Sequence, residues 1–339
     1  MNYGYFVVSL DEDIAVDRKM TPEQDQALIS DLRTIELSDQ TLFTEAVAEG
    51  GIAGWSYYFP YLQLFGRSSK RERLLFETFE GSIAVYRVKE RRGKPANLSL
   101  LVPPFPWNET LARRALERSA AYNADRRGRI SRVSESDLTA VARLGLDLRF
   151  NMDEFVYDRH AVDQAVGKDF ARLRRNVNRF INDETELRAY GPDDAEACEQ
   201  LLDGWQKRMT ERAIQIGPFR RYARLCLRSA QDFGELLSGH VIEIDGKIAA
   251  FSFGGPINSE TGSVFVTVSD HDHAGIAYRQ RMELLRAFPD LAYFNDGADS
   301  GRPGMAMMKN VFRPIAKSCV CSARTVSNSG SLRREARKK

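Results

Sequence analysis

NDGADSGRPGMAMMKNVFRP, residues 295–314, follows a short apolar and aromatic run at residues 291–294. Two acids, Asp296 and Asp299, lie near its start, and Lys309 lies in the Met-rich part that follows. The backbone can bend sharply at three glycines, Gly297, Gly301 and Gly304. Carboxylates, an amine and bends directly after a strand are typical of a functional site at the edge of a sheet. An ordinary solvated loop with a helix cap is the alternative interpretation.

The composition predicts a soluble globular protein. The 339 residues are 43% apolar and 28% charged, which excludes the disordered and membrane-spanning classes. The net charge of +2 indicates no particular partner. Residues 1–17 carry acids and no basic leader, so we expect no secretory signal. The four cysteines lack the paired spacing of metal ligands, which favours reduced thiols and a cytoplasmic protein.

Strand and helix patterns alternate along the whole chain. Strands are predicted at residues 81–88, 97–102, 129–133, 148–157, 187–190, 237–244, 247–253, 263–268, 291–294 and 315–325. Helices are predicted at residues 21–49, 109–123, 163–183, 192–212 and 275–288. The clearest local signals are the Asp245-Gly246 hairpin turn and the Asn108 helix cap. The mixture predicts an α+β fold of two tandem domains, residues 1–157 and 158–328, followed by a basic flexible tail at 329–339.

Basic residues gather on the predicted helix at residues 163–183. Arg174 and Asn178 are four residues apart and share one helix face, and Arg175 and Arg179 form a neighbouring row. Such rows could hold a phosphate of a nucleic acid, a nucleotide or a lipid through bidentate guanidinium contacts. The alternative is that they form salt bridges with the acids at the two ends of the same helix.

Three segments resemble landmarks of one family. The first is EFVYD, residues 154–158. The second is Gly167-Lys168 followed by Arg174, Asn178, Arg179 and Phe180. The third is the series Asn295, Asp299, Gly301, Gly304, Lys309, Phe312 and Pro314. Over about residues 50–320 the chain thus resembles the C-terminal catalytic domain of phosphatidylglycerol lysyltransferases and its stand-alone relatives.

The resemblance implies two tandem acetyltransferase-like (GNAT) domains, with the active site in the second. It implies an enzyme that moves an aminoacyl group from aminoacyl-tRNA to a lipid head group or to a small hydroxyl or amine acceptor. In this reading Asp299 orients the donor amino group or accepts a proton, and Lys309 offsets negative charge or binds phosphate. The implied catalytic residues are Asp299, Lys309 and Asp296. The implied substrate- and phosphate-binding residues are Arg174, Arg175, Asn178, Arg179, Asn295, Arg313 and Gly275, with Asn295 also expected to form an Asx turn.

The chain departs from the family pattern at three positions. Gly297 and Ala298 stand where the family carries acids, and Ala306 stands where it carries an arginine. These differences remove a proton acceptor and an anion clamp, and Asp296 is the candidate to replace the lost acid. An acceptor other than phosphatidylglycerol and a loss of activity both stay open as alternatives.

No cofactor is predicted. Residues 271–277 lie between a strand and a helix, where acetyltransferases bind a pyrophosphate, and Gly275 would open that helix. Asp272 adds negative charge there, so acetyl-coenzyme A is less favoured than aminoacyl-tRNA as the co-substrate. His271 and His273 give only weak support for a metal, and we predict no metal site.

Two other functions compete with aminoacyl transfer. One is an acyl-coenzyme-A-dependent N-acyltransferase, and the other is a non-catalytic binding or regulatory protein with the same fold. The expected partners are aminoacyl-tRNA and a lipid or small-molecule acceptor, with peripheral contact at the inner face of the membrane. The aromatic cluster at residues 55–65 is interpreted as packed core or a lid, and a groove for an acyl chain or a stacked base is the alternative.

Overall fold

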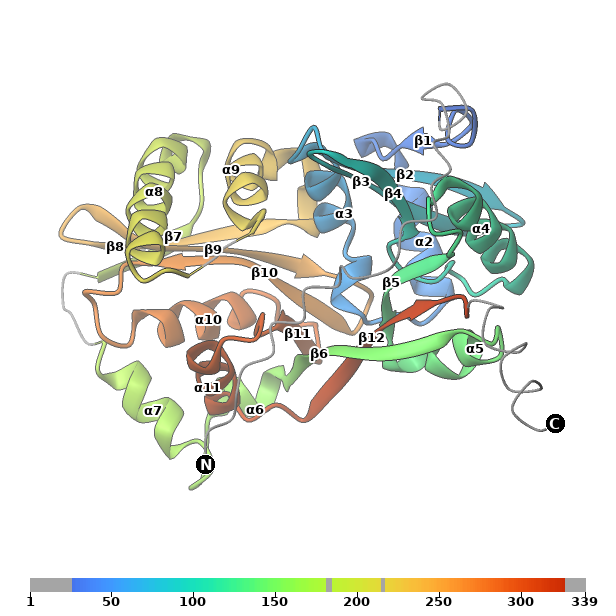
Figure 1. Ribbon diagram of the computed structural model, residues 1–339. Coiled ribbons are helices and arrows are strands. Elements are labelled where there is room, and N and C mark those ends of the chain that lie inside the picture. Colours follow the sequence, from blue (N-terminus) through green and yellow to red (C-terminus); the bar gives the residue numbers. More distant parts are fainter. Residues whose placement is uncertain (1–25, 181–184, 215–216, 327–339) are drawn as a thin grey trace, which may run out of the picture.

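The computed structural model describes residues 26–180, 185–214 and 217–326 (Figure 1). The elements of the first half are β1 (Arg33–Thr34), η1 (Leu37–Asp39), α2 (Gln40–Glu49), η2 (Trp55–Tyr57), α3 (Phe59–Arg67), β2 (Glu72–Phe79), β3 (Ser82–Arg91), β4 (Lys94–Leu100), α4 (Glu109–Tyr122), β5 (Arg129–Ser134), η3 (Glu135–Asp137), α5 (Leu138–Ala142) and β6 (Asp147–Asp158).

The second half continues with helices and strands in alternation. Its elements are α6 (Arg159–Gln164), α7 (Ala171–Asn178), β7 (Thr185–Ala189), η4 (Pro192–Asp194), α8 (Ala195–Glu211), α9 (Phe219–Ser229), η5 (Ala230–Leu236), β8 (Ser238–Ile244), β9 (Lys247–Pro256), β10 (Thr261–Ser269), α10 (Ile276–Arg286), β11 (Tyr293–Ala298), α11 (Pro303–Val311) and β12 (Ala316–Arg324).

Both halves contribute to a single sheet. Within the described residues, twelve strands pair in the order β1-β2-β3-β4-β5-β12-β6-β11-β10-β9-β8-β7. Most neighbours are antiparallel, whereas β4 with β5 and β10 with β11 are parallel. Helices pack against these strands, so the predicted α+β class with a mainly antiparallel sheet is confirmed.

The last strand of the chain returns to the first half. β12 lies between β5 and β6 and pairs antiparallel with both. Since β6 also pairs with β11, the sheet runs without interruption from one half to the other. The predicted boundary between residues 157 and 158 falls at the end of β6. It stays a prediction, because strands from both sides of this boundary belong to one sheet.

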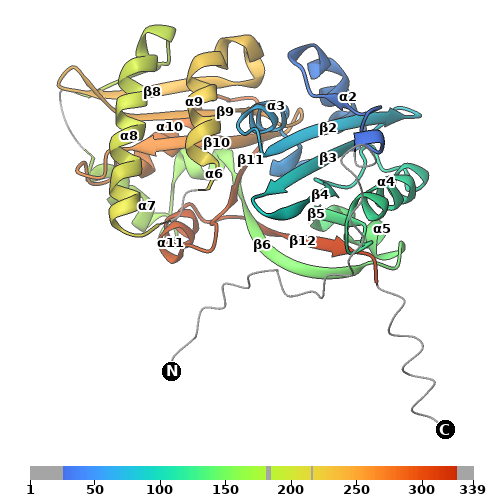
Figure 2. The same ribbon diagram turned by 45° about the horizontal axis from the view of Figure 1, so that its top comes forward.

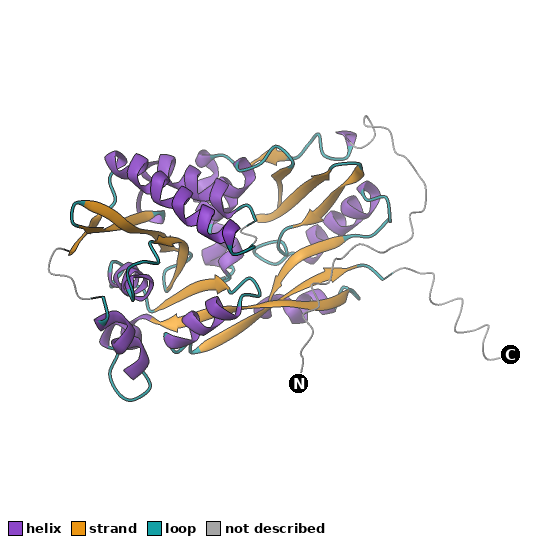
Figure 3. Ribbon diagram, turned by 60° about the vertical axis from the view of Figure 1, so that its left-hand side comes forward, coloured by secondary structure: helices purple, strands orange, loops and turns teal. Residues whose placement is uncertain are grey.

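The hydrophobic core also crosses the junction. α8 and α9 lie on one face of the second-half strands and α10 lies on the other (Figures 1 and 3). α3 of the first half contacts α9 (Figure 2). Phe43 of α2 and Phe59 of α3 belong to the same buried cluster as Phe251 and Phe265 of the second half. Burial of this shared aromatic surface stabilises the contact between the halves.

Several local predictions are confirmed. The Asn108 side chain accepts a hydrogen bond from the Leu111 amide at 2.9 Å and so caps α4. Asp245 and Gly246 have φ values of 52° and 71°, as a two-residue hairpin turn requires. The aromatic cluster at residues 55–65 is packed core, since Tyr57, Tyr58, Phe59, Tyr61 and Phe65 are at most 5% exposed.

Two predicted helices are wrong in extent. In place of one helix over residues 163–183, α6 and α7 are separated by a loop in which Ala165 and Gly167 have φ values of 46° and 84°. Left-handed conformations end a right-handed helix, and the continuous polar pattern concealed this break. The helix predicted over residues 21–49 is replaced, where the structure describes it, by β1, η1 and α2 after a short helical turn.

β11 is longer than the strand predicted at residues 291–294. It begins at Tyr293 and includes Asn295, Asp296 and Gly297 before it ends at Ala298. Asn, Asp and Gly are depleted in strands, so propensity placed them in a loop. Pairing with β6 and β10 overrides that preference and buries Asp296.

Candidate functional site

The candidate site lies where β11 leaves the sheet. β11 pairs with β10 at residues 293–295, and its register with β6 shifts between Asn295 and Ala298. Gly297, within this shift, has a φ of 61°, a conformation that favours glycine. A Cβ on Gly297 would lie 3.4 Å from the Trp55 indole. The bulge therefore places the end of β11 against an aromatic side chain of the first half.

Four buried polar side chains meet at this bulge. The Asp296 carboxylate accepts hydrogen bonds from the Tyr157 hydroxyl at 2.9 Å and from Arg281 Nε at 3.2 Å. Its Oδ1 lies 3.4 Å from Lys309 Nζ. The side chains of Asp296, Arg281 and Lys309 are at most 6% exposed. Burial raises the pKa of Tyr157, and the negative charge of Asp296 adds to that rise.

Lys309 also binds the main chain of the bulge. Its ammonium donates hydrogen bonds to the carbonyl oxygens of Asp296, Gly297 and Ala298, the last two at 3.1 Å. Burial lowers the pKa of Lys309, and the charge of Asp296 opposes that shift. Because an ammonium has three N–H donors, this geometry favours a positioning role for Lys309. Its predicted direct role in catalysis stays a prediction.

Asn295 links the bulge to the first half. Its Nδ2 donates to Glu154 Oε2 at 2.7 Å and to the Ala53 carbonyl oxygen at 3.2 Å. Its Oδ1 accepts from the Gly297 amide at 2.9 Å, which confirms the expected Asx turn. Glu154 is only 4% exposed and also accepts from the Trp55 amide at 3.1 Å. A substrate-binding role for Asn295 stays a prediction.

Asp299 lies in the turn between β11 and α11. Its Oδ1 accepts from the Gly301 amide at 2.8 Å, and its carbonyl oxygen accepts from the Arg302 amide at 3.1 Å. Among the described residues nothing else bonds to its carboxylate, and the residue is half-buried. The sequence predicted both acids as catalytic candidates. The structure brings Asp296 into contact with Lys309 and, within residues 26–180, 185–214 and 217–326, gives Asp299 Oδ2 no partner.

Aromatic side chains connect β10, β11 and the first half. Trp55 Nε1 donates to the carbonyl oxygen of Val264 at 3.0 Å, next to a register shift in β10. The rings of Trp55 and Tyr61 are 4.6 Å apart between centroids. Phe265 stacks on Tyr222 of α9 at 5.5 Å. The Trp55 indole therefore contacts both β10 and β11 just beyond their last paired residues.

The N-terminus of α10 is covered by another helix. Gly275 has a φ of 91°, and a Cβ there would overlap the Asn176 carbonyl oxygen of α7. Asp272 pairs with Arg208 of α8, with two N–O distances of 3.0 and 3.1 Å. A carbonyl oxygen packed at this position disfavours an anion. The packing explains why glycine stands there, and the predicted phosphate contact of Gly275 stays a prediction.

A basic cavity lies beside α7. It has a volume of about 450 Å³ and is lined by Lys168, Asp169, Ala171, Arg172, Arg175, Asn176, Arg179 and Arg313. Five of these side chains are cationic and one is acidic, so the cavity is suited to an anion. A second cavity of about 300 Å³ shares Arg172 and Arg313 with the first.

The predicted phosphate-binding arginines divide into two groups. Arg175, Arg179 and Arg313 line the basic cavity together. Arg174 instead donates to the carbonyl oxygens of Ala165 and Gly167, the latter at 2.8 Å. The exposed Asn178 is not among the lining residues. Asp163, one of the acids expected to pair with these arginines, pairs with Arg286 at 2.7 Å, and Asp183 lies outside the described residues.

Residues 71–319 match a family model described as "Phosphatidylglycerol lysyltransferase, C-terminal". The chain belongs to this family. The match spans well over half of the 339 residues and confirms the resemblance seen in the sequence. No curated protein matches the chain.

Solved structures share the fold at low sequence identity. A conserved protein of unknown function from Bacteroides thetaiotaomicron has a TM-score of 0.74 at 21% identity, over 87% of this chain and 99% of that one. L-PGS from Bacillus licheniformis has a TM-score of 0.56 at 16% identity, over 92% and 94%. A tandem GNAT protein from the clavulanic acid biosynthesis pathway has a TM-score of 0.51 at 13% identity, over 87% and 98%. The family member thus has the tandem GNAT-like fold that the sequence predicted.

Three buried residues of the site were not among the predicted site residues. Glu154 and Tyr157 lie in the EFVYD landmark, and their signal was the presence of polar side chains in a strand between two halves. Arg281 gave no such signal, because an arginine in a helix normally faces solvent. Its 6% side-chain exposure and its bond to Asp296 emerge only from the packing of α10 on β11.

No helix in the described part of the chain is both long and apolar enough to cross a bilayer.

Proposed function

We propose that this protein is an aminoacyltransferase that moves an aminoacyl group from aminoacyl-tRNA to a lipid head group or to a small hydroxyl or amine acceptor. Membership of a family named for lysyl transfer to phosphatidylglycerol supports this reaction class. The observation that carries the proposal is the half-buried Asp299 carboxylate, which has one oxygen without a bond to any described residue and follows directly on the backbone bound by Lys309.

The reaction needs a proton acceptor next to the ester. The acceptor oxygen or nitrogen forms a bond to the ester carbonyl carbon, and the bond from that carbon to the ribose oxygen breaks. The proton lost by the acceptor ends on the ribose oxygen. In this proposal Asp299 Oδ2 takes this proton and returns it, or holds the ammonium group of the donor. Asp299 is therefore the proposed catalytic residue.

The buried residues position Asp299 in this proposal. Lys309 binds three consecutive carbonyl oxygens immediately before Asp299, and the Asn295 Asx turn constrains the same bulge. Catalytic groups need such support because a displacement of about 1 Å can cost roughly 100-fold in rate. Asp296 contributes through Lys309 and Arg281, since its carboxylate is buried against them.

The basic cavity would hold a phosphate of one substrate. Arg175, Arg179 and Arg313 offer guanidinium groups suited to a phosphate. Arg313 follows the C-terminal end of α11, and Asp299 precedes its N-terminal end. Nine helical residues span roughly 13–14 Å, so an extended substrate can contact both ends.

An acyl-coenzyme-A-dependent reaction is less well supported. The α10 N-terminus is packed against α7, the Asp272 acid beside it is already paired with Arg208, and Trp55 contacts both β10 and β11. We expect no thermal stabilisation by acetyl-coenzyme A. A clear upward shift of the melting temperature would favour that alternative.

The decisive experiment supplies tRNAs that each carry one radiolabelled amino acid. Phosphatidylglycerol vesicles or a pool of small amines and alcohols serve as acceptors. We expect acceptor-dependent loss of label from one charged tRNA, and a decrease of about 100-fold or more in that rate for Asp299→Asn. Asp290→Asn, at an exposed acid of the same half, should keep the wild-type rate. Intact charged tRNAs under all conditions would overturn the proposal and leave a non-catalytic binding protein.

A further inference from the structure

The face that carries the basic cavity also carries exposed apolar side chains. Val166, in the loop between α6 and α7, is 73% exposed, and Met307 on α11 is 55% exposed. Met307 lines the smaller cavity with Arg172 and Arg313, both of which also line the basic cavity. Val166 lies two residues before Lys168, another lining residue. Apolar and cationic side chains thus border each other on one face.

Arg174 supports the loop that carries Val166. It donates hydrogen bonds to the carbonyl oxygens of Ala165 and Gly167, on either side of the valine. The loop, residues 165–170, projects beyond the helices at the lower left of Figure 1. The Arg174 side chain therefore holds the backbone of the loop, and the Val166 side chain stays exposed to solvent. This arrangement is typical of a loop that presents an apolar side chain to a partner.

The cations of the cavity are not neutralised within the described part of the chain. Lys168, Arg172, Arg175 and Arg179 form no salt bridge or side-chain hydrogen bond with any described residue. Arg313 donates to the main-chain oxygen of Asp169 at 2.7 Å, and no carboxylate of the described residues pairs with its charge.

The arginine cluster on α9, by contrast, is paired with acids. On α9, Arg220 and Arg224 both contact Asp203, and Arg228 pairs with Glu199. The contrast shows that the cavity beside α7 concentrates positive charge that an external anion can neutralise.

We propose that loop 165–170, α7 and the C-terminal end of α11 form a docking surface for an anionic phospholipid bilayer. Lipid phosphates occupy the basic cavity, and Val166 and Met307 enter the boundary between head groups and acyl chains. The lining residues of both cavities contain no aromatic ring on which a base could stack, and this favours lipid over RNA. Only the purpose of docking rests on the proposed function. Docking would bring an acceptor lipid to one end of α11, and Asp299 lies at the other end of that helix.

Vesicle sedimentation tests this surface without any turnover. We expect the full chain to bind vesicles of equal parts phosphatidylcholine and phosphatidylglycerol, and to leave pure phosphatidylcholine vesicles unbound. Arg175→Glu with Arg179→Glu should lower the partition coefficient by roughly tenfold or more. Val166→Asp should also weaken binding, since it removes the apolar contact and adds repulsion. High salt should release the wild type, because the attraction is electrostatic.

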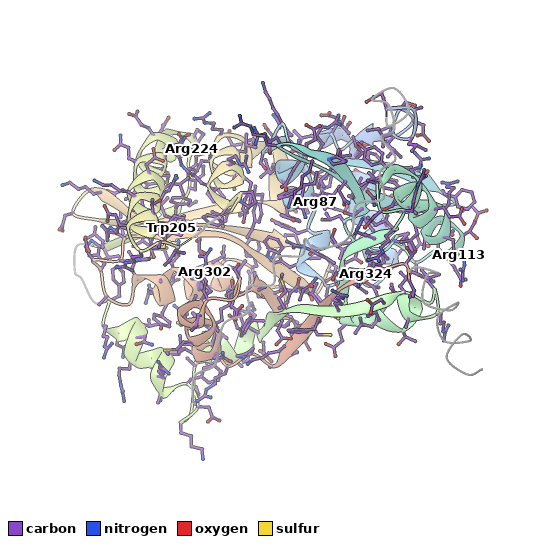
Figure 4. The ribbon with its side chains drawn as sticks, in the orientation of Figure 1. Arg87, Arg113, Trp205, Arg224, Arg302 and Arg324 are labelled. Atoms are coloured by element: carbon purple, nitrogen blue, oxygen red, sulfur yellow. The ribbon has the colours of Figure 1, made fainter. Side chains whose placement is uncertain are left out.

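The matched control reverses two exposed cations elsewhere. Arg92→Glu with Arg113→Glu makes the same change in net charge, and Arg113 lies on α4, at the opposite end of the molecule from α7 (Figure 4). This variant should keep most of the wild-type binding. Equal losses in the two double variants would show that net charge alone matters and would overturn a defined surface. Circular dichroism checks folding, and Val166→Asp together with the salt titration tests the surface if the α7 variant does not fold.

Three further outcomes would each overturn the docking proposal. They are equal binding to both vesicle types, no binding to either, and wild-type vesicle binding by the α7 double variant. Loss of tRNA binding with unchanged vesicle binding in that variant would assign the face to RNA. The two proposals can fail separately. Transfer to soluble acceptors without vesicle binding would support the enzymatic proposal and contradict the docking surface. Vesicle binding without transfer would support the docking surface and contradict the enzymatic proposal.

Discussion

Lys309 and Asp296 contact each other through both main chain and side chain. The ammonium of Lys309 donates to the Asp296 carbonyl oxygen and lies 3.4 Å from the carboxylate of the same residue. One lysine therefore binds the backbone of the β11 bulge and, together with Arg281, neutralises the acid that this bulge carries. The turn that contains Asp299 starts at this point, so its position depends on a buried ion pair from which solvent is excluded.

Replacement of Lys309 by methionine should destabilise the protein by about 3–5 kcal/mol, because it leaves three carbonyl oxygens without their donor, while Asp296 keeps only Arg281 as its cationic partner. Urea-induced unfolding measures the change. Lys317→Met is the matched control, since both ammonium groups lie over the Phe155 ring, at 5.6 and 5.4 Å, and only Lys317 is exposed. We expect the control to change stability by about 0.5 kcal/mol or less. Similar losses in the two variants would contradict the assignment.

Glu154→Ala should lower the free energy of unfolding by about 2–4 kcal/mol. The substitution leaves the Trp55 amide and the Asn295 side chain without their shared acceptor at the junction of the two halves. Glu154→Gln should recover more than half of this loss, because an amide oxygen can accept the same two hydrogen bonds. Thermal unfolding of both variants, with the exposed Glu235→Ala as control, tests the expectation. Equal effects of alanine and glutamine would mean that charge, not hydrogen bonding, stabilises the junction.

Gly275→Ala should lower the free energy of unfolding, and Gly204→Ala should raise it. Alanine at Gly275 meets an unfavourable φ of 91° and the Asn176 carbonyl oxygen, so we expect a loss of roughly 2 kcal/mol or more. Gly204 lies inside α8, and a Cβ there meets nothing within 4 Å. Alanine should therefore stabilise that helix by up to about 1 kcal/mol. Urea midpoints give both values, and a neutral Gly275→Ala would show that α7 does not pack on the α10 N-terminus.

His240 on β8 should make the protein less stable in mild acid. Burial lowers the pKa of its imidazole below the ordinary value near 6.5, and the charge of Glu283 opposes this shift. As the pH falls below about 6.5, the unfolded chain takes up a proton before the folded one does, so the free energy of unfolding decreases. Above that pH the effect is absent.

His240→Gln should reduce the difference in urea midpoint between about pH 7.5 and about pH 5.5. The pKa of His271 is lowered by burial as well, so the difference should shrink without vanishing. The exposed His160→Gln serves as the control and should keep the wild-type difference. An unchanged difference in His240→Gln would show that this imidazole is not shielded from solvent.

The sequence singled out the segment that carries the buried polar cluster but did not show how its side chains are arranged. Residues 295–314 were singled out, and Arg175, Arg179 and Arg313 were grouped as phosphate ligands before the structure brought them to one cavity. The pattern could not show that Asp296 contacts Lys309 directly, or that Arg174 supports a loop. Those outcomes depend on a bulge in β11 and on a break between α6 and α7, and each depends on a few backbone angles.

Short-range forces account for the features that the sequence predicted correctly. The Asp245-Gly246 turn, the Asn108 cap and the alternation of strands and helices follow from local φ preferences and apolar periodicity. Tertiary structure decided the insertion of β12 between β5 and β6 and the bond from Asn295 to Glu154, which are 141 residues apart. It also decided which charges are buried, because burial arises when distant segments pack together. Electrostatic interactions strengthen as water is excluded, so the character of the site depends on contacts that no local pattern records.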